Sequence, residues 1–166
     1  MYLAIFTSSV ALHGINGEAT ESFYQVVPET YAAAEQSAGF VWRAAPEEVI
    51  FDESGKMKRF AYEATPSFYE DRDNVLQTLS VWKDLSTAWN YVYSGTHLSQ
   101  LRRRSEWMAK PIRAQYVLWW IEDDSMPTHV DGVQRLELLD QAGPTPAAFN
   151  FRNAFSSTGE PVASLG

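Results

Sequence analysis

The stretch YVYSGTHLSQLRRRSEW at 91–107 holds the side chains best suited to chemistry, His97 and a run of three arginines at 102–104. A histidine titrates near neutral pH, so His97 can act as a general acid or base, or bind haem iron through one ring nitrogen. A buried histidine bonded to a backbone carbonyl is the structural alternative. Successive helix residues point about 100° apart, so the three arginines cannot all reach one site. We expect a solvated run that pairs with Glu106, with at most one or two arginines turned toward a substrate anion.

A second set of candidate residues lies on predicted strands. In the run VLQTLSVW at 75–82, the hydroxyls of Thr78 and Ser80 share one face with Trp82, because side chains alternate along a strand. Two hydroxyls are unusual against a helix layer, so this face is expected to be the pocket side. Arg43 is costly to bury alone, and it must therefore be exposed, paired or aimed at an anionic ligand.

Two further aromatic residues complete the candidate set. A continuous helix would place Tyr93 and His97, which are four residues apart, on one face. Trp119 and Trp120 point to opposite sides of a strand, so one packs under the helices and the other faces a pocket, with core packing as the alternative for each. The predicted catalytic residue is His97, and the predicted substrate-binding residues are Trp82, Tyr93, Trp120, Arg43, Thr78 and Ser80.

The elements that position these residues follow the order strand, helix, strand, ribbon, strand, two helices, strand, helix. This order predicts an α+β fold, a ferredoxin-like antiparallel sheet with helices on one face. The open sheet face needs cover, and a homodimer that joins two sheets into a dimeric α+β barrel supplies it. We expect one domain over 1–156 with a β-ribbon insertion at 46–74, and a flexible tail at 157–166. The predicted strands are 2–6, 40–44, 75–82 and 115–121, and the predicted helices are 18–37, 84–93, 96–108 and 130–141.

Composition excludes several classes of protein. A net charge of −8 argues against nucleic-acid binding, and the absence of cysteine excludes disulfides and thiolate chemistry. The chain has neither a signal-peptide pattern nor an apolar run of about 20 residues, so we expect a cytoplasmic protein with no membrane partner. His13 and His129 have no companion at ligand spacing, so no metal site is expected.

Five segments carry a resemblance to a known family: GFVWR at 39–43, LSVWKDLSTAWNYVYSGTH at 79–97, LRRRSEWM at 101–108, VLWWI at 117–121 and RLELLDQAGPTPAAFNFRNAF at 135–155. In this order they resemble the domain-of-unknown-function family DUF3291. The resemblance implies the dimeric α+β barrel superfamily, distantly similar to antibiotic-biosynthesis monooxygenases, whose members commonly hold an apolar ligand between the sheet and the helices of one protomer. A haem-degrading branch has a strand-end tryptophan and a histidine on the next helix, which Trp82 and His97 resemble.

Three hypotheses follow. The first is a small enzyme of specialised metabolism that uses no cofactor and acts on an apolar aromatic or polycyclic molecule in a barrel pocket. Its reaction is oxygenation, or an acid/base cyclisation or isomerisation, with His97 as the acid or base. The second is a haem-binding or haem-degrading protein with His97 as the axial ligand. The third is a non-catalytic ligand-binding homodimer in which His97 is only packed.

Overall fold

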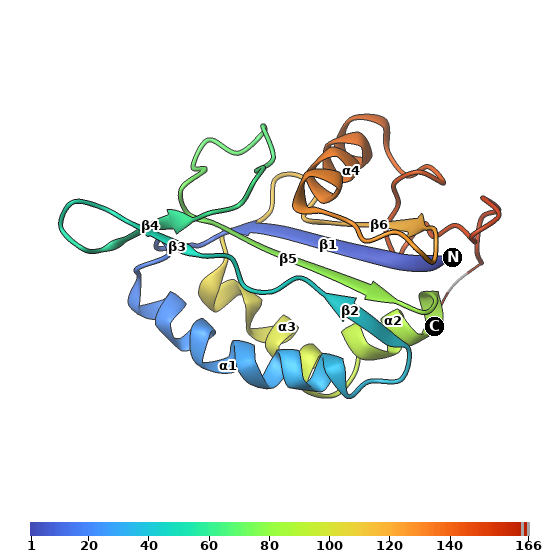
Figure 1. Ribbon diagram of the computed structural model, residues 1–166, viewed down its shortest axis with the longest axis horizontal. Coiled ribbons are helices and arrows are strands. Elements are labelled where there is room, and N and C mark those ends of the chain that lie inside the picture. Colours follow the sequence, from blue (N-terminus) through green and yellow to red (C-terminus); the bar gives the residue numbers. More distant parts are fainter. Residues whose placement is uncertain (164, 166) are drawn as a thin grey trace.

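The computed structural model describes residues 1–163 and 165, and Figure 1 shows how their strands and helices are arranged. All the strands and helices expected from the sequence are present, with ends that differ from the expected ones by a few residues at most. Their bounds are β1 Tyr2–Val10, α1 Glu18–Glu35, β2 Phe40–Arg43, β3 Val49–Phe51, β4 Met57–Phe60, β5 Val75–Trp82, α2 Leu85–Val92, α3 Gly95–Trp107, β6 Tyr116–Ile121 and α4 His129–Ala142.

The main sheet is antiparallel and has the strand order β2-β5-β1-β6. In this order β1 and β2 run parallel with β5 between them, and β5 and β6 run parallel with β1 between them. Right-handed crossovers therefore place α1 and the α2–α3 pair on the same face of the sheet, which Figure 1 shows below the strands. The ferredoxin-like α+β fold is confirmed.

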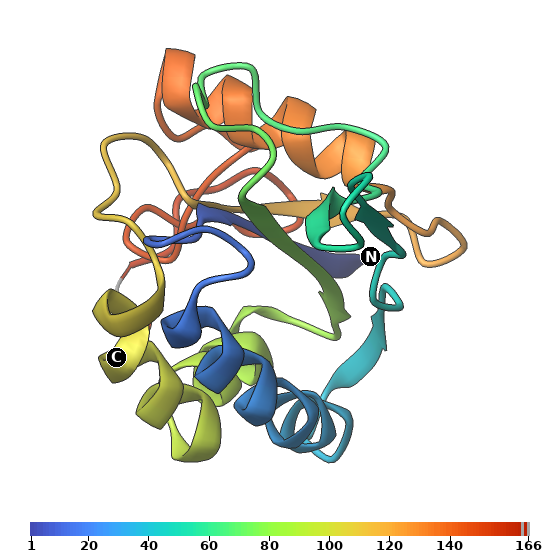
Figure 2. The same ribbon diagram turned by 90° about the vertical axis from the view of Figure 1, so that its left-hand side faces the viewer.

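The fourth helix lies on the opposite face, above the strands in Figures 1 and 2. Its buried residues Val133 and Leu136 pack in one cluster with Phe6 and Trp119 of the sheet. The segment 61–74 covers more of this face and is tied to α4, because the Ser67 backbone N–H donates to the Glu137 carboxylate at 2.7 Å. The prediction that the helices share one face is thus wrong for α4, and the sheet face expected to need a second chain is covered by this one.

A break in the chain separates α2 from α3. The Asp84 carboxylate caps α2 by accepting from the Thr87 backbone N–H, and the helix ends at Tyr93. Gly95 then adopts a φ of +50°, a left-handed conformation that a glycine takes without steric cost, and α3 begins in a new direction. The continuous helix that would place Tyr93 and His97 on one face does not form.

The β-ribbon predicted within 46–74 is present as the antiparallel pair β3–β4, which projects from the main sheet in Figure 1. The expected tail begins with a turn, in which the Ser156 backbone N–H donates to the Glu160 carbonyl at 2.8 Å. The Val162 N–H then donates to the Ala154 carbonyl, which returns the chain to the β6 side of the fold. The flexibility of residues 157–166 stays a prediction. None of the helices described is long and apolar enough to cross a membrane.

Candidate functional site

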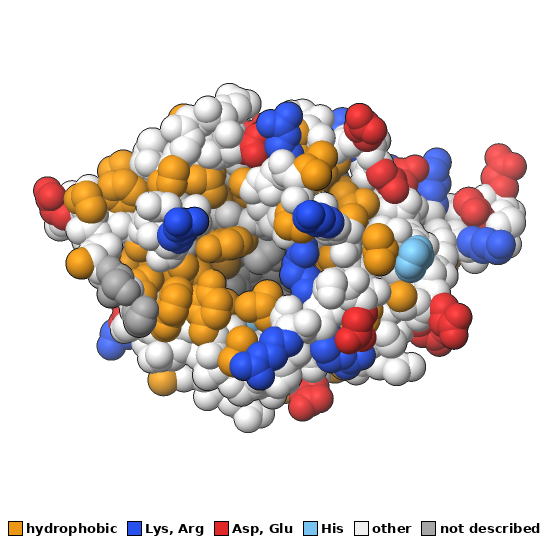
Figure 3. All heavy atoms as spheres, turned by 180° about the vertical axis from the view of Figure 1, so that it is seen from behind, with side chains coloured by type: hydrophobic (Ala, Val, Ile, Leu, Met, Phe, Trp, Pro, Cys, Tyr) orange, Lys and Arg blue, Asp and Glu red, His pale blue; other side chains and the backbone are white. Residues whose placement is uncertain are grey.

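The two faces of the sheet differ in exposure. On β5 the residues that face α4, among them Gln77 and Leu79, are buried, whereas Thr78 on the other face is exposed. β2 pairs with β5 only at Ser80–Trp82, so Thr78 lies beyond the end of β2, and its exposure shows that neither β2 nor the layer of α1, α2 and α3 covers it. Figure 3 shows the molecule hollowed between α3 and the β6 edge, with basic side chains beside the hollow. We call this space the chamber; its sheet side consists of Thr7, Ser9, Leu76, Thr78 and Ser80.

The hydroxyl-bearing face of β5 is therefore turned toward three helices, not away from them as the sequence suggested. The hydroxyls satisfy one another or neighbouring groups: Thr7 Oγ1 and Thr78 Oγ1 lie 2.7 Å apart, and Trp82 Nε1 donates to Ser80 Oγ at 2.9 Å. Trp82 itself is fully buried and packs edge-on against Phe40. Of these predicted residues, Thr78 and Ser80 line the chamber and Trp82 closes one end of it.

Helix α3 supplies the opposite wall through a stripe of residues at helical spacing. Two contacts fix the position of the helix over β1. Arg104 donates from a guanidinium N–H to Ser9 Oγ at 2.9 Å, and the Leu12 backbone N–H donates to the Trp107 carbonyl at 2.8 Å. Gln100 lies four residues before Arg104, about 6 Å along the helix axis.

His97 lies one turn before Gln100 on the same stripe. Its Nδ1 is 2.9 Å from the Val92 carbonyl oxygen, which can only accept, so Nδ1 carries the proton and Nε2 keeps its lone pair. Its ring packs on Tyr91 with 4.8 Å between centroids, and Tyr91 stacks on Trp82 at 4.7 Å. Burial lowers the pKa of His97 below its ordinary value, against a smaller opposing effect of the Val92 bond. His97 is therefore a neutral imidazole at pH 7 with a basic nitrogen.

Arg43 lies beside the chamber and has a partner. Its guanidinium is 2.8 Å from Glu35 Oε1 and stacks over the Tyr31 ring, 4.0 Å from the centroid. Burial raises the pKa of Tyr31, and the charge of Arg43 partly opposes this. The sequence left three possibilities for Arg43: exposed, paired, or aimed at an anionic ligand. The structure shows that it is paired.

Tyr93 and Trp120, also predicted to bind substrate, lie apart from His97. The Tyr93 ring packs on Trp89 with 4.1 Å between centroids and on Phe151 at 5.8 Å. Trp120 donates from Nε1 to the Phe155 carbonyl at 2.8 Å. Both lie on the same sheet side as the chamber, in the cluster formed with the C-terminal segment, and their contact with a substrate stays a prediction.

The three arginines 102–104 point in different directions, as helix geometry requires. Arg102 is exposed, and Arg103 pairs with Glu106 at 3.0 Å while its guanidinium lies over the Trp107 ring. Arg104 is half-buried and reaches Ser9. One arginine of the run is thus turned inward, which agrees with the expectation from the sequence.

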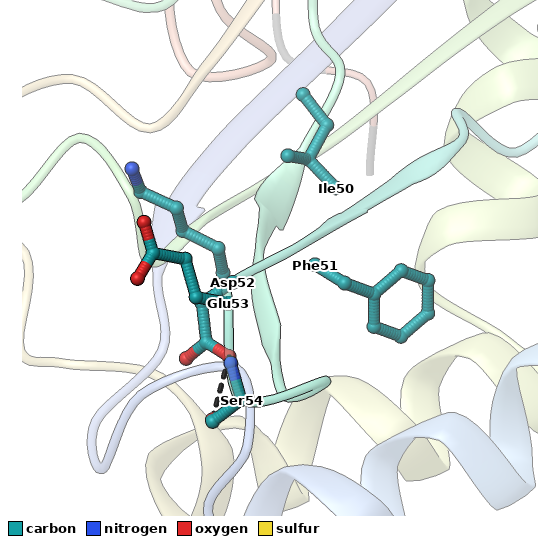
Figure 4. Close-up of a pocket in the computed structure, with 6 residues that line it drawn as sticks. Ile50, Phe51, Asp52, Glu53 and Ser54 are labelled. Carbon is teal, nitrogen blue, oxygen red and sulfur yellow. Dashed lines mark hydrogen bonds between the residues drawn. The ribbon is translucent and has the colours of Figure 1, made fainter.

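Other polar groups lie outside the chamber. An open hollow of about 630 Å³ lies on the β3–β4 ribbon, where Figure 4 shows the Phe51 ring pointing away from Asp52 and Glu53. Its Asp52 carboxylate is occupied by the Ser54 hydroxyl and by backbone N–H groups of its own turn. His129 lies 3.2 Å from Glu47, on the α4 side. Within the described residues, no group of three or more His, Asp or Glu side chains could hold a metal ion.

Gln100, Thr7 and Tyr91 were not among the predicted site residues. Gln100 Oε1 is buried and has no hydrogen-bond partner among the described residues, which is rare for an amide oxygen. A signal for Gln100 was present, because His97, Gln100 and Arg104 follow one another at intervals of three and four. Thr7 shares a strand face with Leu3 and Ile5, but only the pairing with β5 shows that it meets Thr78.

Comparisons with known proteins give one family and several distant folds. No curated protein matches the chain as a relative. A conserved protein from Methanosarcina mazei Go1 is 11% identical, with 74% of this chain and 94% of that chain covered and a TM-score of 0.49. SnoaB, a cofactor-independent oxygenase from Streptomyces nogalater, is 13% identical, with 76% and 97% covered and a TM-score of 0.45. Likenesses at this level carry no argument about activity. The chain belongs to the family described as "Domain of unknown function (DUF3291)", whose family model matches residues 2–164.

Proposed function

We propose that this protein is an enzyme that binds an apolar aromatic molecule in the chamber and transfers a proton through His97. The observation that supports this most directly is a neutral imidazole that packs on Tyr91, which in turn stacks on Trp82 at the end of the β5 face that carries Thr78 and Ser80. Aromatic side chains such as Tyr91 supply the apolar surface that an aromatic substrate needs.

The chemistry of such a site begins with removal of a proton from an activated C–H or O–H by Nε2 of His97. Nδ1 stays bonded to the Val92 carbonyl, which stabilises the imidazolium while it holds the proton. The substrate anion then has three outcomes. Return of the proton at another carbon is an isomerisation, attack on a carbonyl of the same molecule is a cyclisation, and reaction with dioxygen is an oxygenation without a cofactor.

The haem alternative finds less support in the polar groups on the sheet side of the chamber. A porphyrin needs broad apolar surface on both sides, whereas this face presents the hydroxyls of Thr7, Thr78 and Ser80. These hydroxyls fit a small hydrogen-bonding substrate better than haem. Titration with haemin checks this: a Soret shift that is present in the wild type and lost in His97→Asn would favour haem.

Proton transfer can be measured before the natural substrate is known. The probe is 2-tetralone, a bicyclic ketone with an acidic benzylic C–H, and the readout is deuterium uptake in D₂O by mass spectrometry. We expect exchange above the buffer rate with the wild type and a fall of about 100-fold or more with His97→Asn, whose Nδ2 can still donate to Val92. His13→Asn, at an exposed position, is the matched control and keeps the wild-type rate. A folded His97→Asn protein with an unchanged exchange rate would rule out the role of His97.

The subunit arrangement is a separate part of the proposal. A homodimer agrees with the fold family, but the sheet face once expected to form it is covered by α4 and 61–74. We propose that the chamber is complete in one chain and that catalysis does not require a second copy. Light scattering after size exclusion measures the oligomeric state, and exchange rates per protomer that do not change with protein concentration would support a site complete in one chain.

A further inference from the structure

We infer that Arg104 is an anion-binding residue of the chamber, and that the aromatic ligand of the proposed function carries one carboxylate, which Arg104 and Ser9 bind. The inference rests on the proposed function, because it assigns the substrate class of the same chamber. Three observations support it: a cation without a carboxylate partner, hydrogen donors that a ligand can reach, and an aromatic surface beside them.

The first observation is the cation. Arg43 is half-buried and pairs with Glu35 at 2.8 Å, whereas Arg104, also half-buried, has no carboxylate within salt-bridge distance among the described residues. Its guanidinium instead donates from Nη2 to Ser9 Oγ at 2.9 Å, which places it at the sheet side of the chamber. Burial lowers the pKa of Arg104, although an arginine stays protonated at neutral pH. A bound anion would balance a charge that a chain with 21 acidic residues leaves unpaired.

The second observation is the set of donors around this cation. Nε and Nη1 of Arg104 have no partner in the part of the chain that the structure describes, and neither atom is closed to solvent. Ser9 Oγ accepts from Arg104, so its own hydrogen can be given to a ligand. Next along the same strand face, Thr7 and Thr78 share one hydrogen bond and keep a second hydrogen, and Thr78 is exposed. A ligand group that meets these donors has to accept hydrogen bonds.

The third observation is an aromatic surface beside the donors. Tyr116 of β6 lies opposite Thr7 of β1, so the two side chains point to the same side of the sheet. The Phe151 ring lies 6.0 Å from the Tyr116 ring and 5.8 Å from the Tyr93 ring, between centroids. Burial raises the pKa of Tyr116 to about 12, so this phenol stays neutral and does not repel an anion. Figure 3 shows basic side chains and apolar surface together at the hollow.

The class of anion follows from the charge available. One guanidinium balances one negative charge, and the neighbouring Arg103 is already paired with Glu106. This favours a carboxylate over a phosphate, which approaches two charges at neutral pH, and over a phenol, which is neutral there. The planar fork of an arginine also matches the two oxygens of a carboxylate. His97 lies two turns, about 10 Å, before Arg104 on the same side of α3, a separation that a carboxylate on two fused rings can span.

The test uses two probes of nearly the same shape. 2-Naphthoate carries one carboxylate, and 2-naphthamide is neutral. Binding is measured by equilibrium dialysis at pH 7.5, with the free probe quantified by chromatography. We expect the wild type to bind 2-naphthoate about tenfold more tightly than the amide, because hydrogen bonds between charged groups are stronger than neutral ones.

Two variants remove the charge of Arg104. Arg104→Gln can still donate to Ser9, and in this variant the two probes should bind alike. Arg104→Met is the second variant if the first is poorly folded by circular dichroism. Arg102→Gln makes the same change of charge at an exposed position of the same helix, so it is the matched control and should keep the tenfold preference.

A further variant separates this inference from the proposed function. Thr78→Trp places a large side chain in the chamber and should abolish binding of both probes. Equal binding of the two probes to the wild type, blocked by Thr78→Trp, would overturn the role of Arg104 and leave the chamber as the ligand site. A preference that persists in the Arg104 variants, or an absence of saturable binding of 2-naphthoate, would overturn the inference without affecting proton transfer to 2-tetralone. Binding that Thr78→Trp does not reduce would overturn both the inference and the chamber.

Discussion

Gly132 provides the sharpest test of how α4 covers the second face of the sheet. A Cβ at this position would lie 2.4 Å from Cδ2 and Cγ of Phe6, on the central strand β1. Gly132 is inside α4 and its backbone is helical, so glycine is not needed for its conformation. Its small size is what allows the helix to approach the strand. We therefore expect Gly132→Ala to destabilise the protein through this contact alone.

Two effects of opposite sign determine the size of the change. Alanine is favoured over glycine inside a helix by about 1 kcal/mol. Overpacking a core typically costs about 1–3 kcal/mol, and Phe6 is fully buried among Val133, Leu136 and Trp119 and has little room to move. Because the Cβ would lie only 2.4 Å from the Phe6 ring, we expect a cost in the upper part of that range, about 2–3 kcal/mol, and a net decrease in the free energy of unfolding of about 1–2 kcal/mol. For a chain of this size that lowers Tm by roughly 2–8 °C.

Urea unfolding followed by tryptophan fluorescence measures this decrease. Gln134→Ala, at an exposed position of the same helix, is the control and should change stability by less than about 0.5 kcal/mol. Phe6→Leu should partly relieve the contact, so the double variant is expected to lose less than the sum of the two single variants. If Gly132→Ala were as stable as the wild type or more stable, helix propensity alone would be acting, and α4 would not lie against Phe6.

Three further predictions concern charge and assembly. Burial lowers the pKa of both His97 and His129, so below about pH 6.5 the unfolded chain binds more protons than the folded one. The free energy of unfolding should fall as the pH is lowered from 7.5 to 5.5. A His97→Asn, His129→Asn double variant should lose less of its free energy of unfolding over this range, measured by urea titration at both pH values. Arg104→Met should cost about 1 kcal/mol through loss of the bond to Ser9, whereas Arg102→Met should be neutral in the same titration, and equal losses would contradict the inward position of Arg104. Light scattering of wild-type protein across a hundredfold concentration range should show a homodimer. A monomer throughout this range would refute the proposed homodimer.

Much of the fold could be predicted because its signals are local. The alternation in VLQTLSVW gave the bounds of β5, and the spacing of apolar residues gave α1. The face taken by α4 is not a local property. α1 and the α2–α3 pair each connect parallel strands, so the handedness of a crossover places them on one face. The chain after α4 returns to the sheet only at Phe149, which pairs antiparallel with Leu118 of β6, so the rule for parallel crossovers does not apply to α4. Contacts between elements, such as the fit of Gly132 against Phe6, decide its position.

The candidate site was harder to predict because it depends on contacts between elements. The sequence placed Tyr93 and His97 on one helix face, but Gly95 takes a left-handed conformation and redirects α3. Thr78 and Ser80 were expected to lie on the face without helices, because hydroxyls are unusual under a packed helix layer. That reasoning holds only where the helices pack directly against the sheet. Here the layer stands off from it. The sequence alone also cannot show that Thr7 meets Thr78, since this depends on the register between β1 and β5.

The covered second face changes what a homodimer would do in this protein. Where two open sheets close on one another, each chain needs the other for its core, and folding and assembly are one process. Here α4 and 61–74 bury Leu79 and Val81 within one chain, so the core is complete before any association. A second copy would then meet a surface other than this face of the sheet. We expect substrate specificity to follow changes at Thr78 and Ser80, and to be independent of substitutions that alter the oligomeric state.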